Sequence, residues 1–98
     1  METLRLLGDY FPTSIFTGKC LVFVSEDCRV ELTEHKSHDF SRGQAQPCVI
    51  RVRIFRKELG EFLQSHSEDF QLAQMGDLAA QIERYVQFAV GRNIREIT

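Results

Sequence analysis

Alternation of apolar and polar residues constrains the fold of this chain more than any other feature. In Cys28–Thr33, and again in Cys48–Phe55, an apolar residue occupies every second position. Side chains of a β-strand point alternately to opposite faces, so a period of two predicts strands that bury one face. An apolar run at Lys19–Ser25, rich in β-branched and aromatic residues, predicts a further strand before them.

The apolar spacing becomes helical after these strands. Apolar residues between positions 55 and 63 recur at i, i+4, i+7 and i+8, which is typical of an amphipathic helix. Ser65 with Glu68 three residues later matches a capping box, which predicts the start of a second, longer helix. Gly91 is the expected C-cap of that helix, and residues 92–98 are expected to fray.

Together these patterns predict an α+β fold, in which a three-stranded antiparallel sheet is followed by two helices packed on one face. The 98 residues are expected to form one small domain, 1–98. Residues 1–7 could begin this domain as a short helix or as a first strand, because periodicity does not separate the two over so few positions.

The charge balance limits the classes of partner. Twelve Lys and Arg against fourteen Asp and Glu leave a net charge of −2, which argues against a dedicated binder of nucleic acid or anionic membranes. No apolar run approaches the roughly 20 residues of a membrane span. Three cysteines, an odd number, fit free thiols in the cytoplasm better than a disulfide framework.

No motif in the chain predicts catalysis or a cofactor. Cys28, His35, His38 and Cys48 are the one set with metal-binding chemistry, and their spacing lacks the close pairing of usual zinc signatures. A zinc-containing domain is therefore a less favoured interpretation. The glycines are scattered and form no phosphate-binding loop. We expect neither an enzyme nor a bound metal.

Two surfaces are candidates for binding a partner. Alternation places Arg29, Arg51 and Arg53 on the predicted open face of the sheet. The polar stretch 34–47 is long for a connection in a compact domain, and such connections are often functional. The candidate partner-binding residues are Arg29, His35, Lys36, His38, Phe40, Arg42, Arg51 and Arg53.

These surfaces favour a non-catalytic protein-binding module, a small regulator or inhibitor that acts through another protein. One alternative is binding of single-stranded nucleic acid or RNA on the arginine-bearing face, where Phe55 could stack on a base. The other is that the arginines only pair with acids on neighbouring strands, for instance Glu31 with Arg51 or Arg53.

The long helix also predicts self-association. Phe88 lies off the main apolar stripe, and a helix that is apolar over more than half its circumference usually buries a second contact. A two-fold homodimer would supply that contact, with Phe70, Tyr85 and Phe88 in the interface. Alternatively, Phe88 packs under the aromatic segment 10–16 of its own chain.

Overall fold

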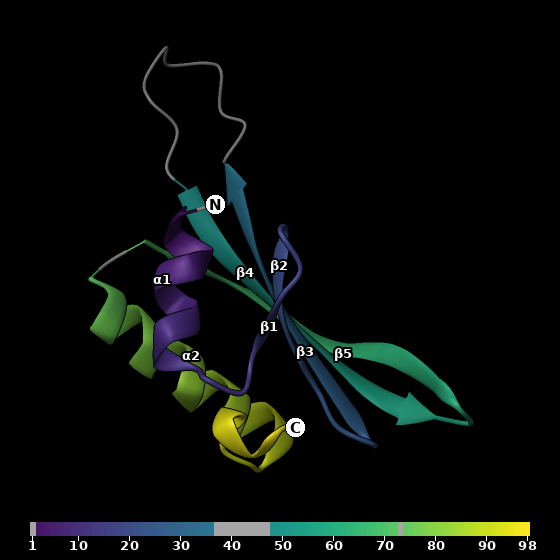
Figure 1. The fold of residues 1–98 in the computed structure, drawn as a ribbon. Helices are drawn as coiled ribbons and strands as arrows, with labels where there is room; N and C mark the ends of the chain where they lie inside the picture. Colours follow the sequence, from purple (N-terminus) through teal and green to yellow (C-terminus); the bar gives the residue numbers. More distant parts are fainter. Residues whose placement is uncertain (1, 37–47, 73) are drawn as a thin grey trace.

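Five antiparallel strands form one sheet in chain order, so the sheet is a meander (Figure 1). The computed structural model describes residues 2–36, 48–72 and 74–98. A helix precedes the sheet, and a helix and a short 3₁₀ turn follow it. The elements are α1 (Glu2–Tyr10), β1 (Ile15–Phe16), β2 (Cys20–Val24), β3 (Cys28–Lys36), β4 (Cys48–Glu58), β5 (Glu61–Gln71), α2 (Met75–Val90) and η2 (Ile94–Glu96).

Both helices cover the same face of this sheet (Figure 1). The even-numbered residues from Cys28 to Leu32 in β3 and from Ile50 to Ile54 in β4 point toward the helices, and Val30, Val52 and Ile54 are completely buried among them. Helix α2 contributes the opposite side of the core through an apolar stripe centred on Ile82 and Val86, both also completely buried. The other sheet face has no helix over it in the described part of the chain, and that face carries the candidate site.

The predicted three-stranded sheet is wrong, because the sheet has five strands. The predicted helix over residues 55–63 is instead the end of β4, a turn and the start of β5. Leu59 and Gly60 form this turn with positive φ angles of 50° and 83°. Two consecutive positive φ values belong to the type I′ turn, whose twist matches that of a hairpin. The apolar residues with helical spacing are thus divided between two strands.

The predicted capping box is also wrong, since Ser65 and Glu68 both lie within β5. The ladder pairs Ile54 with His66 and then Phe55 with Gln64, which leaves Ser65 as the extra residue of a β-bulge. The Ser65 hydroxyl donates a hydrogen bond to the carbonyl oxygen of Ile54 at 3.3 Å. Its side chain therefore supports the strand pairing.

Helix α2 begins at Met75, later than predicted, and ends as predicted at Gly91. Gly91 adopts a left-handed φ of 79°, and its N–H donates to the carbonyl oxygen of Gln87 at 2.9 Å. Left-handed C-caps favour glycine because it has no Cβ to clash.

The N-terminal and C-terminal segments of the chain both pack against the core. The open question about residues 1–7 is decided in favour of a helix, α1, which buries Leu4 and Leu7. The predicted fraying of residues 92–98 is wrong, because Ile94 and Ile97 are completely buried. The guanidinium of Arg95 donates to the carbonyl oxygen of Tyr10 at 2.9 Å, which joins the two segments.

Candidate functional site

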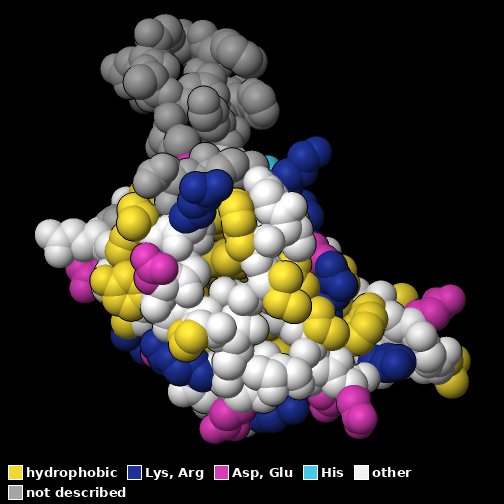
Figure 2. Space-filling view, viewed as in Figure 1, with side chains coloured by type: hydrophobic (Ala, Val, Ile, Leu, Met, Phe, Trp, Pro, Cys, Tyr) yellow, Lys and Arg dark blue, Asp and Glu magenta, His cyan; other side chains and the backbone are white. Residues whose placement is uncertain are grey.

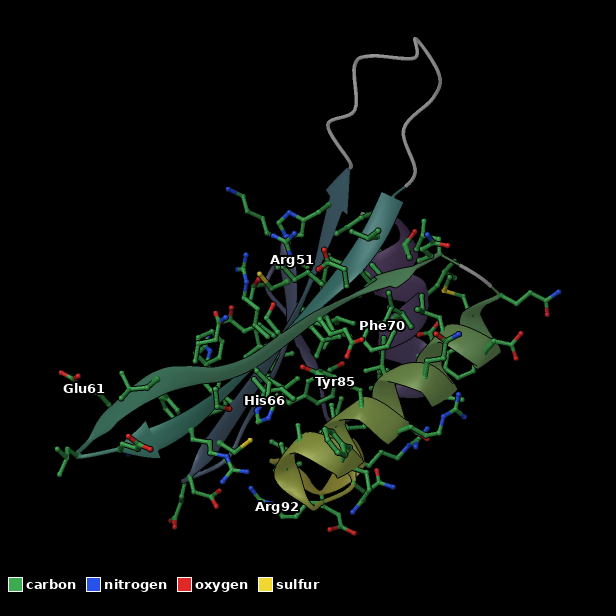
Figure 3. All side chains as sticks on the ribbon, turned by 180° about the vertical axis from the view of Figure 1, so that it is seen from behind. Arg51, Glu61, His66, Phe70, Tyr85 and Arg92 are labelled. Atoms are coloured by element: carbon green, nitrogen blue, oxygen red, sulfur yellow. The ribbon has the colours of Figure 1, made fainter. Side chains whose placement is uncertain are left out.

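The open face of the sheet, opposite the helices, is the candidate site. As alternation predicts, it carries Arg29 from β3 and Arg51 and Arg53 from β4. His35, expected in the polar stretch 34–47, lies instead on β3, because this strand continues to Lys36 and places His35 on the same face. The register places Arg29 across from Phe55, Glu31 across from Arg53 and Thr33 across from Arg51. Figure 3 shows Arg51 on the side of the β4–β5 pair away from α2.

Two of these arginines form ion pairs on the same face. The Nε of Arg29 donates to Oε2 of Glu31 at 2.7 Å, two residues along the same strand. Arg51 makes a bidentate contact with Asp69 on β5, at 2.7 and 3.1 Å. These hydrogen bonds from Arg51 hold the pKa of Asp69 below its usual value of 3.8. The alternative that the arginines pair with acids on neighbouring strands therefore describes Arg51, although its partner is Asp69 and not Glu31. Glu31 pairs instead with Arg29 on its own strand.

Arg53 differs from its neighbours, since it forms no hydrogen bond or ion pair with any residue in the described ranges. It lies across from Glu31 on one side and Ser67 on the other. A surface hollow of about 530 Å3 opens beside it. The hollow is lined by Arg51, Arg53, Gln64, Ser67, Glu68 and Asp69. This arrangement leaves one half-buried guanidinium with donors available to a ligand.

His35 extends the open face toward the end of β3. Its Nε2 lies 2.7 Å from the hydroxyl of Thr33, two residues earlier. Partial removal from water lowers the pKa of His35 below 6.5, and the positive charges of Arg51 and Arg53 lower it further. His35 is therefore held in its neutral form beside the arginines at neutral pH.

The second predicted surface falls largely outside the described residues. His38, Phe40 and Arg42 lie outside the described residues. Lys36 is the last residue of β3, and its side chain is also outside the description. Partner binding by residues 37–47 of the polar stretch therefore stays a prediction.

The structure describes the side chains of two of the four candidate zinc ligands, Cys28 and His35, and these two lie far apart. Cys28 is buried on the helix side of β3, as expected of a core cysteine, whereas His35 lies on the open face of the same strand. Residues seven apart on a strand are separated by roughly 23 Å at about 3.3 Å per residue. Burial also raises the pKa of the Cys28 thiol, which disfavours the thiolate that a metal requires.

The predicted dimer residues do not form one surface. The rings of Phe70 and Tyr85 pack edge to face within the chain, with centroids 5.6 Å apart, between β5 and α2 (Figure 3). Phe88 is 82% exposed on α2. The alternative in which Phe88 packs under segment 10–16 is therefore wrong.

Sequence reasoning missed the contribution of β5 to the site. Gln64, Ser67 and Asp69 line the hollow, yet the sequence pattern predicts no strand in this segment. Residues 66–71 contain one apolar residue, Phe70, so they carry no apolar–polar alternation from which a strand could be predicted. The bulge at Ser65 also interrupts the alternation toward Glu61.

Comparison of the chain with protein-family models, with curated proteins and with solved structures finds no match. No helix in the described ranges combines the length and apolar character needed to cross a membrane. The chemistry of this chain's own residues is thus the basis for a functional proposal.

Proposed function

We propose that this chain is a non-catalytic protein-binding module, a small regulator or inhibitor of the cytoplasm, that takes its partner on the open sheet face. The observation that carries the proposal is Arg53, a half-buried guanidinium without a described partner beside a surface hollow. A guanidinium offers five donors in a planar fork that fits a carboxylate in two hydrogen bonds. The partner group is an Asp or Glu carboxylate on another protein.

The surroundings of Arg53 favour a protein over a polyanion. Asp69 and Glu31 offset the charges of Arg51 and Arg29 and place negative charge within the same face. Affinity for nucleic acid comes mainly from neutralising phosphates, so these acids lower it. Figure 2 also shows basic and acidic side chains interspersed over the side of the molecule that it presents. Mixed charge is typical of surfaces that select a protein partner by complementary pattern.

A charge reversal at Arg53 tests the proposal. Purified wild-type chain, Arg53→Glu and Arg5→Glu are used as matched baits in an extract of the source organism. Arg5 is exposed on α1, on the helix side of the sheet, so it controls for the change in net charge. A protein retained by wild type and by Arg5→Glu should be lost with Arg53→Glu. With that protein purified, its Kd should weaken by about tenfold or more.

Two outcomes would contradict the proposal. A partner that binds all three baits equally would show that the open face is not its binding surface. Binding of a random single-stranded oligonucleotide at roughly 50 mM salt, lost in Arg53→Glu and steeply weakened by added salt, would favour nucleic-acid binding instead.

A further inference from the structure

The β4–β5 hairpin extends beyond the part of the sheet that the helices cover (Figures 1 and 3). Its base is attached to the body of the protein. The backbone N–H of Lys57 donates to the carbonyl oxygen of Asp27 at 3.0 Å, and the guanidinium of Arg56 donates to that of Ala89 at 2.8 Å. These contacts end just before the turn, so they hold the hairpin end, residues 58–63, in a set direction.

Leu59, at the turn of the hairpin end, is an unfavourable choice for its position. Its φ of 50° lies in the left-handed region, where a non-glycine residue carries a steric cost and where asparagine or glycine is usual in such turns. The side chain is also fully exposed, so no burial within the chain offsets this cost. A strained backbone at a fully exposed apolar residue points to a role outside the folding of the chain.

The charges of the hairpin end are unfavourable as well. Glu58 and Glu61 lie directly across from each other, and like charges in such cross-strand positions destabilise a hairpin. Neither carboxylate forms an ion pair with a residue in the described part of the chain. Lys57, next to Glu58 in the chain, lies instead over the ring of Phe62, 5.7 Å from its centroid. Leu63, close to these acids, is 47% exposed.

We propose that the hairpin end is a docking element that inserts Leu59 into an apolar pocket of a protein partner. Lys or Arg side chains at the rim of that pocket would face Glu58 and Glu61. Binding would then remove the leucine from water and offset the paired negative charges. Since the base of the hairpin is already held in place, little ordering is required on binding. This surface is separate from Arg53, so the two proposals can fail independently.

Two substitutions should separate binding from stability. Leu59→Asn suits the left-handed φ, and Glu61→Lys replaces the repulsion with attraction, so each should raise the urea midpoint of the free protein. Each should nevertheless weaken the Kd for the partner, by about tenfold or more for Leu59→Asn. Leu6→Asn, at a leucine 44% exposed on α1, is the matched control and should leave the Kd unchanged.

A photo-reactive leucine analogue at position 59 identifies the partner for these measurements. Illumination in an extract of the source organism should cross-link it to one protein, at apolar residues that adjoin Lys or Arg. The proposal is overturned if position 59 cross-links to no protein, if it cross-links to a second copy of this chain, or if Leu59→Asn binds the partner as tightly as wild type does.

Discussion

At the scale of single residues, position on a strand decides which charges meet. Alternation in the sequence correctly places Arg29, Arg51 and Arg53 on one face, because side-chain direction in a strand has a period of two regardless of what surrounds it. Alternation does not predict which acidic residues these arginines pair with. Arg51 pairs with Asp69, eighteen residues away, and that contact exists only because β5 lies beside β4.

His35 should make folding stability depend on pH. Its pKa is lower in the folded chain than the usual 6.5, so the unfolded chain binds more protons as the pH falls below that value. The free energy of unfolding should therefore decrease as the pH falls from about 6.5 toward the lower folded pKa, and His35→Gln should reduce this decrease. Urea titrations of wild type and His35→Gln at several pH values measure this change in the free energy of unfolding. An NMR titration of the His35 ring that gave a pKa at or above 6.5 would contradict the prediction.

At the scale of elements, the β4–β5 hairpin is the part of the fold that the sequence pattern predicts least well. Phe55, Leu59, Phe62 and Leu63 have helical spacing, but the structure distributes them over two strands and a turn. A positive φ at a leucine is rare, so the Leu59–Gly60 pair lacks the usual turn signal of Asn-Gly or Asp-Gly. The bulge at Ser65 then shifts the alternation of β5 by one residue. Local periodicity therefore could not distinguish this hairpin from a helix.

Helix α2 leads to a prediction about self-association. Phe88 is 82% exposed beside a surface hollow of about 490 Å3, and a two-fold pairing of this helix surface would bury both copies of the ring. We expect light scattering to give twice the mass of one chain, and Phe88→Ser to give the mass of one chain. A wild-type mass of one chain at high concentration would contradict the dimer.

At the scale of the whole molecule, residues 91–98 complete the core. Ile94 and Ile97 are completely buried, and the guanidinium of Arg95 lies 5.5 Å from the ring centroid of Phe11. From the sequence, residues 92–98 are expected to fray after the glycine cap at Gly91. Its two isoleucines contact the core because α2 carries them back to α1 and the sheet.

The variant Ile97→Ala should show how much residues 91–98 contribute to the free energy of unfolding. Removal of a buried isoleucine side chain leaves a cavity, so the free energy of unfolding should decrease by about 2–5 kcal/mol. Thr98→Ala, at an exposed neighbour, should leave it nearly unchanged. Equilibrium unfolding in urea compares the two variants with wild type. An effect of Ile97→Ala as small as that of Thr98→Ala would mean that the segment frays in solution after all.

Local sequence pattern is sufficient to predict the α+β class, three of the five strands, the glycine cap of α2 at Gly91 and the face on which the arginines lie. These features depend on local periodicity and on the backbone preference of glycine, which act within a few residues. The strand at residues 61–71, the contact of Asp69 with Arg51 and the lack of a described partner for Arg53 emerge only in the folded chain. Pairing with β4 outweighs the weak local preference of residues 61–71, and pairing depends on residues distant in the chain.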